Sequence, residues 1–300
     1  MSSILERTQK LVDIIQQQAH VCDVETIRKK LLRIIEDGLT NLHIICDFDG
    51  TITRHFNSKG ERNPASHTLL SRSSRFTREY KIEVQKRFDH YYPIEMSTTM
   101  TKEEKTPYMV EWWNQAHELL VGQKINKDDI KGMVAETEVE MRPGLDALIN
   151  KCKDKNIPFL VFSAGLGDVI EQVLISKNLF HPDNMHIVSN QMGFNEETGI
   201  CDHFKEPMIH VFNKSEVMIK DTPYYTTIKN RGNVILLGDS IGDLQMAAGI
   251  HHDTCLAIGF LNSAISENLD TYSKVFDIVV LGDGPMDVAN LIIKSSNGYA

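Results

Sequence analysis

Short apolar runs alternate with helical patterns over the second half of the chain, and this alternation constrains the fold more than any other feature. After Pro143 the runs cover residues 157–162, 186–189, 233–237, 254–259 and 277–281, and the helical patterns cover 144–154, 167–178, 240–249, 262–270 and 285–295. Strands that alternate with helices in this way predict a parallel sheet with helices on both faces. Near-continuous apolar strands fit a sheet that is buried on both sides.

The first half of the chain adds one strand and a long helical insert. Residues 42–46 predict a strand that leads into the sequence DFDGT, and two helical patterns precede it. The insert carries few strand signals and has helical candidates at 74–91, 101–122 and 126–138. We therefore expect an α/β protein with a Rossmann-like parallel sheet. Its expected parts are 1–53 (N-terminal helices and first core strand), 54–143 (a helical cap inserted after that strand) and 144–300 (the remainder of the α/β core). Ligands bind at the carboxyl ends of strands in such sheets, so the cap should lie over the site.

Composition excludes several classes of partner. The 300 residues include 32 basic and 41 acidic side chains, a net charge of −9, whereas a nucleic-acid-binding protein usually has a basic excess. The five cysteines are scattered without a CxxC pair, which is typical of a reducing compartment. The apolar runs are far shorter than the roughly 20 residues of a membrane helix, and the N-terminus has no signal-peptide core. We expect a cytoplasmic monomer that binds neither nucleic acid polymers nor membranes.

Polar residues follow four of the apolar stretches, where strands of the sheet should end. They are Asp47 and Asp49, Ser163 and Ala164, Lys214, and Asp239 and Asp243. Asp47 and Asp49 are two residues apart, so both side chains point to the same side of an extended chain. Carboxylates that lie close together repel one another unless a cation or a proton lies between them. Hard oxygen ligands suit Mg²⁺, so the sequence predicts a Mg²⁺ site at this edge of the sheet.

The same residues can carry phosphoryl transfer. Once the cation reduces charge repulsion, one Asp can attack a phosphoryl group and form an aspartyl-phosphate. Ser163 and Lys214 can hold the phosphoryl oxygens and neutralise the developing charge. The second Asp of the pair, Asp49, is placed to give a proton to the leaving alcohol and later to take one from water. Burial beneath the cap should raise the pKa of Asp49.

Each motif alone has another interpretation. DFDGT and GDSIGD could be capped turns, and Lys214 could be a solvated lysine. An EF-hand loop is excluded because its sixth and twelfth positions, which need Gly and Glu, are Ile52 and Ser58. The stretch SAGLG lacks the third glycine of a dinucleotide site, and the sequence has no P-loop motif. The specific signal is the order and spacing of the four motifs together.

These four motifs, in this order over residues 47–243, resemble those of the haloacid-dehalogenase-like phosphatase superfamily. A more specific similarity covers nearly the whole chain, cap included. The stretches YYPIE (91–95), EEKTPYMVEWW (103–113), VFSAGLGDVIEQV (161–173), HVFNK (210–214) and ILLGDSIGDLQMA (235–247) resemble the cytosolic pyrimidine 5'-nucleotidases and their 7-methylguanosine-phosphate-hydrolysing relatives.

This resemblance implies a role for each matching residue. It implies that Asp47 is the nucleophile and a metal ligand, that Asp49 is the acid/base with its backbone carbonyl on Mg²⁺, and that Asp239 is the third protein ligand. Asp243 matches an outer carboxylate near the metal. The implied substrate contacts are the phosphate-binding turn Ser163 and Ala164, the phosphate-binding Lys214, and Glu95, which reads the edge of the base.

Three positions depart from the family pattern, and the loss of a Ser at one of them leaves the base open between a pyrimidine and 7-methylguanine. Gly50 replaces an expected Met, Ala116 replaces a Ser that helps to bind the nucleotide, and Trp113 replaces an aromatic residue that is often Tyr. An indole can stack on a base and attract a cationic methylated guanine. Adjacent residues point about 100° apart on a helix. We expect Trp113 to face the cleft and Trp112 to face the interior of the cap.

The expected function is a Mg²⁺-dependent 5'-nucleotidase that hydrolyses CMP, UMP or 7-methyl-GMP through an aspartyl-phosphate. Three alternatives are a nucleoside phosphotransferase, a phosphatase for another small phosphomonoester, and a catalytically silent binding module. A silent module should have lost a carboxylate or Lys214, and this sequence retains all of them.

Overall fold

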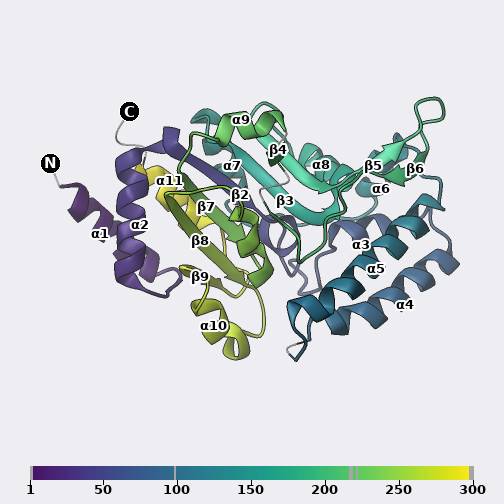
Figure 1. Ribbon diagram of the computed structural model, residues 1–300, viewed down its shortest axis with the longest axis horizontal. Coiled ribbons are helices and arrows are strands. Elements are labelled where there is room, and N and C mark those ends of the chain that lie inside the picture. The colour runs from purple at the N-terminus through teal and green to yellow at the C-terminus, as the bar shows by residue number, and fades with distance from the viewer. Residues whose placement is uncertain (1–2, 98, 216–218, 221, 297–300) are drawn as a thin grey trace.

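A seven-stranded sheet forms the centre of the molecule (Figure 1). The computed structural model describes residues 3–97, 99–215, 219–220 and 222–296. The strands are β1 (His20–Val21), β2 (Leu42–Cys46), β3 (Phe159–Leu166), β4 (Met185–Asn190), β7 (Asn233–Gly238), β8 (Thr254–Leu261) and β9 (Ile278–Leu281). Their order is β1-β9-β8-β7-β2-β3-β4, and every neighbouring pair is parallel except β1–β9. The predicted α/β fold with a parallel central sheet is confirmed.

Two hydrophobic cores lie on opposite faces of this sheet, because successive side chains of a strand point in opposite directions. Ile44 and Val161 belong to one core, whereas their neighbours Ile45 and Leu160 belong to the other. The first core includes side chains of α1 (Ile4–Gln16), α2 (Val24–Asp37), α7 (Leu145–Asp154), α8 (Gly167–Ser176) and α11 (Asp287–Ser296). The second includes side chains of α9 (Pro223–Ile228), η4 (Ile241–Ala247) and α10 (Ile265–Ser273). Burial on both faces explains why the strands are apolar throughout.

The chain leaves the core at Thr53 and returns at Met141, and these two crossings pair as an antiparallel bridge. Between them lie α3 (Ser66–Ser71), α4 (Arg78–Glu95), α5 (Lys102–Val121) and α6 (Asp129–Ala135). These helices occupy the right side of Figure 1, next to the β3 side of the sheet. Thr101 caps α5 through a capping box with Glu104, as the sequence pattern predicts.

Several short elements have no counterpart in the sequence patterns. They are β1, α3, α9 and the hairpin of β5 (Met192–Phe194) and β6 (Cys201–Phe204). Strand β6 packs against α5, so the hairpin extends the helical side of the molecule (Figure 1). Such strands are too short to show the apolar alternation that identifies a strand in a sequence.

Four predicted helices need correction at their ends or in their type. The helix predicted at 74–91 is α4, which starts after its cap Thr77 and continues to Glu95. The pattern at 126–138 gives only the short α6, and the one at 262–270 is shifted to α10. The pattern at 240–249 gives the 3₁₀ helix η4 (Ile241–Ala247), whose N-cap Ser240 accepts a hydrogen bond from the backbone N–H of Gly242. Glycine within this stretch disfavours a regular α-helix.

Candidate active site

Three carboxylates converge at the carboxyl ends of neighbouring strands β2 and β7. Asp47 follows β2, and Asp239 and Asp243 follow β7. One oxygen from each of the three lies within 4.8 Å of the others. Asp47 and Asp243 are buried, and Asp239 is half-buried. The parallel register of β2 with β7 brings together residues that are almost two hundred positions apart in the sequence.

Lys214 is buried among these carboxylates. Its Nζ lies 2.5 Å from Asp47 Oδ1 and 2.8 Å from Asp243 Oδ1. Burial alone would lower the pKa of Lys214, but Asp243 and Asp47 outweigh that effect and raise it. Burial raises the pKa of Asp239, and repulsion by Asp47 and Asp243 raises it further. One ammonium therefore accompanies three carboxylates, two buried and one half-buried, and this excess of hard oxygen donors fits Mg²⁺.

The turn after β2 depends on glycine. Gly50 has φ +81°, and a Cβ added there would lie 2.3 Å from Asp239 Oδ2. The backbone N–H of Gly50 donates to Thr53 Oγ1 at 3.0 Å, which closes the turn. The side chain of Asp239 therefore occupies space that a larger residue at position 50 would need. This is the position at which the relatives were expected to carry Met.

Asp49 is held by a residue that the sequence motifs do not indicate. Its carboxylate accepts hydrogen bonds from the backbone N–H of Ser66 at 3.0 Å and from Ser66 Oγ at 3.1 Å. Ser66 is the first residue of α3, so a helix of the insert touches the predicted acid/base. Burial raises the pKa of Asp49, and the two bonds from Ser66 partly oppose that rise. The direction is the one expected for a proton donor.

Ser163 and Ala164 lie within β3, in the stretch between Phe162 and Leu166 where its register with β4 shifts. The hydroxyl of Ser163 accepts a hydrogen bond from the backbone N–H of Gly165 at 3.0 Å. The carbonyl of Ala164 accepts from Trp113 Nε1 at 2.9 Å and from Asn190 Nδ2 at 2.8 Å. Asn190 lies at the end of β4, outside every motif.

The two tryptophans of α5 are both half-buried and have different partners. Trp113 reaches the Ala164 carbonyl of β3, whereas Trp112 stacks on Tyr91 of α4 with ring centroids 5.6 Å apart. Trp113 thus joins the insert to the predicted phosphate turn through its N–H group. The sequence prediction assigned this residue only a stacking role.

Glu95 is the last residue of α4 and is half-buried. Burial raises its pKa to about 7, although Lys105 and Lys214 act in the opposite direction. Lys105 Nζ also donates to the backbone carbonyl of Glu95 at 2.9 Å and lies 5.9 Å from the ring centroid of Phe212. Lys105 and Phe212 lie inside stretches that resemble the family, but no residue-type signal singled them out.

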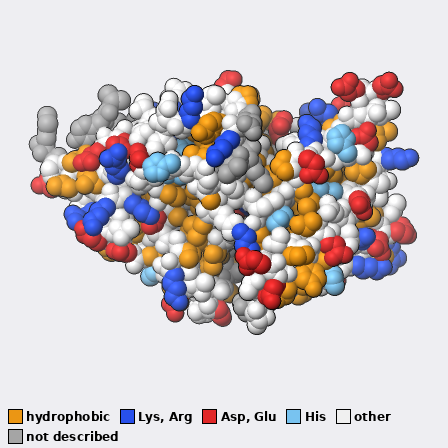
Figure 2. Space-filling model, viewed as in Figure 1, with side chains coloured by type: hydrophobic (Ala, Val, Ile, Leu, Met, Phe, Trp, Pro, Cys, Tyr) orange, Lys and Arg blue, Asp and Glu red, His pale blue; other side chains and the backbone are white. Residues whose placement is uncertain are grey.

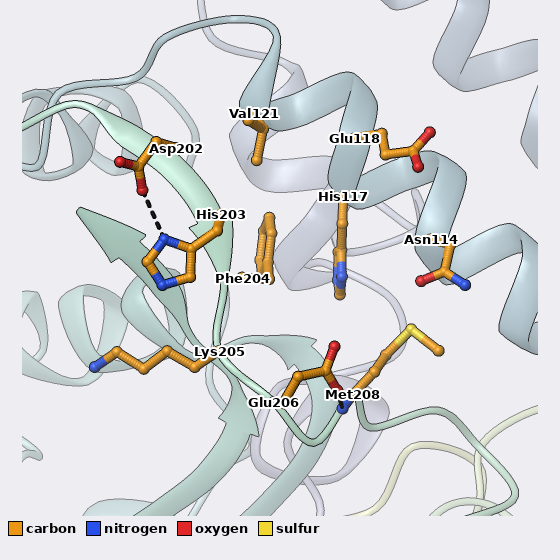
Figure 3. A pocket seen from close by; sticks show the side chains of 10 residues that line it. All are labelled: Asn114, His117, Glu118, Val121, Asp202, His203, Phe204, Lys205, Glu206 and Met208. Carbon is orange, nitrogen blue, oxygen red and sulfur yellow. Dashed lines mark hydrogen bonds and ion pairs between the residues drawn. The ribbon is translucent and has the colours of Figure 1, made fainter. Parts of the chain in front are cut away.

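A separate cavity of about 240 Å³ lies between α5 and β6 (Figure 3). The rings of His117 and Phe204 stack face to face there, with centroids 3.8 Å apart. Asp202 pairs with His203 at its edge. None of the predicted site residues lines this cavity, so it is distinct from the carboxylate site.

Comparison with known proteins identifies the family. A family model described as pyrimidine 5'-nucleotidase (UMPH-1) matches residues 50–296. This chain belongs to the pyrimidine 5'-nucleotidase family. The 7-methylguanosine phosphate-specific 5'-nucleotidase of Gallus gallus is 41% identical over 271 residues, which cover 90% of this chain and 93% of that protein. The Homo sapiens protein of the same name is 42% identical over 258 residues, covering 86% and 85% of the two chains.

Solved structures agree with this assignment. The crystal structure of cytosolic 5'-nucleotidase IIIB bound to cytidine matches with a TM-score of 0.89 and 32% identity, over 96% of each chain. A HAD-family hydrolase from Salmonella enterica matches with a TM-score of 0.52 and 15% identity, over 85% of this chain and 71% of that one. The second match shows the fold alone. The expected family, fold and enzyme class, a phosphoric monoester hydrolase, are thereby confirmed.

The visible surface carries charged side chains of both signs. Figure 2 shows acidic and basic side chains interspersed over the visible face, without a continuous basic area. Among the described residues, no helix combines the length and the apolar character that crossing a membrane requires.

Proposed function

We propose that this protein is a Mg²⁺-dependent 5'-nucleotidase that hydrolyses CMP, UMP or 7-methyl-GMP to the nucleoside and phosphate. The observation that carries the proposal is the cluster of Asp47, Asp239 and Asp243 at the ends of β2 and β7, in which Lys214 pairs with Asp47 and Asp243. Two comparisons support the choice of bases. Several relatives are named for 7-methylguanosine phosphate, and the structurally similar cytosolic 5'-nucleotidase IIIB was crystallised with cytidine.

In the proposed reaction, an Asp47 oxygen attacks phosphorus and the bond between phosphorus and the ester oxygen breaks. Asp49 gives its proton to the leaving nucleoside oxygen, and its raised pKa favours the protonated form needed for this step. Water then attacks the aspartyl-phosphate while Asp49 takes its proton, which releases inorganic phosphate and restores Asp47. The ammonium of Lys214, now bonded to Asp47, is placed to pair with a phosphoryl oxygen.

The residues that would hold Mg²⁺ are Asp47, Asp239 and the backbone carbonyl of Asp49, with Asp243 as a neighbouring carboxylate. When bound, the ion would offset the repulsion between the carboxylates and the phosphoryl dianion. Asp47 and Asp243 already share Lys214 as a counter-charge. Among the residues that the structure describes, no cation pairs with Asp239, which instead lies 3.4 Å from the side-chain amide of Asn262.

Substrate selection is assigned to the insert and to the second half of β3. Ser163 and Ala164 would bind the phosphate, Glu95 would accept hydrogen bonds from the base, and Trp113 would stack on it. Trp113 already bonds to the Ala164 carbonyl, so base and phosphate contacts meet at one point. We also retain the division into 1–53, 54–143 and 144–300, supported by the paired crossings at Thr53 and Met141. A cytoplasmic monomer is part of this proposal.

The test is phosphate release from CMP, UMP and 7-methyl-GMP with Mg²⁺, repeated with EDTA. Hydrolysis should require the metal, and Asp47→Asn should lower kcat by about 10³-fold or more because the nucleophile is lost. Asp270→Asn, an exposed position on α10, is the matched control. Acid-quenched enzyme should carry one phosphoryl group on the peptide that contains Asp47. If all three nucleotides stay intact, the assigned substrates are wrong; if p-nitrophenyl phosphate also stays intact, the catalytic assignment is wrong.

A further inference from the structure

Arg142 is a buried arginine at the point where the chain returns from the insert to the core. It follows Met141, which bridges to Thr53, and its own backbone N–H donates to the carbonyl of Ile52 at 2.9 Å. Its side chain is 0% exposed. The guanidinium carbon lies 4.2 Å from the ring centroid of Phe260, so one face of the group packs on an aromatic ring. A buried cation of this kind requires a partner for nearly every N–H.

The partners of Arg142 belong to the turn that carries Asp47 and Asp49. Its Nε donates to the carbonyl of Thr51 at 2.6 Å, and its Nη2 donates to the carbonyl of Gly50. Nη1 donates to the carbonyl of Gly284 at 2.6 Å. The guanidinium of Arg142 therefore fixes the directions of the Gly50 and Thr51 carbonyls. The backbone N–H of Gly50 donates to Thr53 Oγ1 at 3.0 Å and shares one planar peptide unit with the Asp49 carbonyl, so the turn also restricts the orientation of that carbonyl.

Asn262 connects the same arginine to Asp239. Its Oδ1 accepts from Arg142 Nη2 at 3.0 Å, while its Nδ2 donates to the carbonyl of Gly50 at 2.9 Å and lies 3.4 Å from Asp239 Oδ2. The acceptor bond to Arg142 determines which end of the amide faces Asp239. Asn262 is buried just after β8, outside every motif of the sequence.

Asp283 extends this network to the outgoing crossing of the insert. Its Oδ1 lies 3.3 Å from Arg142 Nη1 and accepts from the backbone N–H of His55 at 2.9 Å. Its Oδ2 accepts from Arg54 Nε and from the backbone N–H of Phe56, both at 3.2 Å. The buried pair of Arg142 and Asp283 thus contacts both crossings between the insert and the core. It also contacts the Gly50 turn and, through Asn262, it is connected to Asp239.

We propose that Arg142 and Asn262 are positioning residues that hold Asp239 and the turn after Asp47 in the arrangement that binds the metal. The inference rests on the proposed function, because it assigns these two residues to the metal site of that reaction. Groups that orient metal ligands affect metal affinity by about 10- to 100-fold when they are changed. A purely structural arginine would contribute to folding without changing that affinity.

Arg231 provides a matched control, because its guanidinium also donates hydrogen bonds to backbone carbonyls. It donates to the carbonyls of Leu39, Leu42 and Asn156, at the end of β2 opposite the carboxylates. Replacing either arginine with lysine keeps the charge and removes the forked donor geometry. Only the change at position 142 should alter the carboxylate site.

The experiment measures how Mg²⁺ raises the Tm of the nucleotide-free protein and, separately, the Mg²⁺ dependence of CMP hydrolysis. Asn262→Ala and Arg142→Lys should each need about 10- to 100-fold more Mg²⁺ for half of the Tm shift. At saturating Mg²⁺, KM for CMP should stay close to that of wild type, since the nucleotide contacts are intact. Arg231→Lys should lose thermal stability but keep the wild-type Mg²⁺ requirement.

The outcomes are distinct. Wild-type Mg²⁺ requirements in Asn262→Ala would overturn the inference even if Arg142→Lys failed to fold. Raised requirements in Arg231→Lys as well would show a general loss of stability, and would also overturn it. If wild-type protein is neither stabilised by Mg²⁺ nor active on nucleotides, the proposed function itself fails, and the positioning role fails with it.

Discussion

Glu95 is a half-buried carboxyl group at the end of α4, and its charge determines what it can recognise. An ionised carboxylate accepts hydrogen bonds from amino and ring N–H groups, whereas a protonated one loses part of that capacity. Burial raises its pKa to about 7, against the lowering effects of Lys105 and Lys214. Glu95 therefore changes charge within the pH range used for enzyme assays.

This titration predicts that the KM for CMP falls as pH rises through about 7. Below that pH the neutral form accepts weakly from the cytosine amino group; above it the carboxylate accepts well. Glu95→Gln should raise KM by roughly 10-fold or more at pH 8 and flatten the profile, because a charged hydrogen bond is lost. Glu103→Gln, an exposed change on α5, is the control. A pH-dependent KM retained in Glu95→Gln would remove Glu95 from base recognition.

Trp113 has two separable contributions, its ring and its N–H group. Trp113→Phe keeps an aromatic ring but removes the bond to the Ala164 carbonyl. A hydrogen bond of this type contributes about 1 kcal/mol, so KM should rise by about fivefold with little change in kcat. Trp112→Phe alters the stack with Tyr91 and the edge contacts with Phe88 and Trp113, but it leaves the bond to Ala164 in place and should change KM less than Trp113→Phe. Steady-state kinetics on CMP decides between the two positions, and equal effects would contradict the assignment of Trp113 to the cleft.

At the scale of elements, α5 connects the insert to the site. Its first turns carry Lys102, which donates to Gln245 Oε1 at 2.6 Å, and Lys105, which contacts Glu95. Trp113 lies two turns further along the same helix and donates to the backbone carbonyl of Ala164. The stability of the α5 N-terminus therefore affects how the insert meets the core.

Removing the α5 cap should change substrate binding more than removing the α4 cap. Thr101→Ala deletes the side chain that accepts from the backbone N–H of Glu104, and Thr77→Ala deletes the equivalent bond to Tyr80. Each should cost about 1 kcal/mol of stability. Only Thr101→Ala should raise KM, by about two- to fivefold, because it loosens the turn that holds Lys105. Thermal denaturation and CMP kinetics measure the two effects, and an equal KM increase in Thr77→Ala would argue against this coupling.

The sequence predicted the long elements and the motif residues, but not their partners. Strands β2 and β7 carry continuous apolar runs, Asp47 and Asp239 follow them directly, and Asp243 comes four residues after Asp239, so local patterns were sufficient. The β5–β6 hairpin has strands of only three and four residues, too short for a periodic signal.

Ser66, Asn190 and Asn262 illustrate a different limit. Ser66 donates to Asp49, 17 positions away, and Asn190 donates to the carbonyl of Ala164, 26 positions away. Asn262 donates to Asp239, 23 positions away. Isolated Ser and Asn residues occur throughout loops and helix ends, so their type alone indicates no function. Only the packing of α3, β4 and β8 against the motif turns assigns them a role.

At the scale of the whole molecule, the fold buries carboxylates that would be more stable in water. Two cores on opposite faces of the sheet fix β2 and β7 side by side, and the acidic residues at their ends cannot separate. Burial raises the pKa of Asp47 to about 7 in spite of Lys214, and it also raises that of Asp239. Burying these charged groups thus lowers the stability of the protein where the proposed chemistry requires charge, as is common at active sites.

The burial of these carboxylates predicts how Mg²⁺ and pH act together on thermal stability. The pKa of Asp47 rises from 3.8 to about 7 on folding, so the unfolded chain binds fewer protons than the native protein between these values. The contribution of Asp47 to stability is therefore fully present below about pH 4 and is lost as pH rises through about 7. We compare wild type with Asp47→Asn in EDTA. The Tm of wild type minus that of the variant should fall by several degrees between about pH 5.5 and about pH 7.5, since each kcal/mol of lost stability lowers Tm by roughly 2–4 °C.

Mg²⁺ should reverse that trend, because it binds the ionised carboxylates and its affinity grows as they lose protons. The Tm increase caused by Mg²⁺ should accordingly be larger at pH 7.5 than at pH 5.5 in wild type, and small at both pH values in Asp47→Asn. Differential scanning calorimetry with and without Mg²⁺ at the two pH values measures all the terms. A Mg²⁺ effect that is equal at both pH values, or equal in wild type and Asp47→Asn, would show that the ion binds elsewhere than at the buried carboxylates.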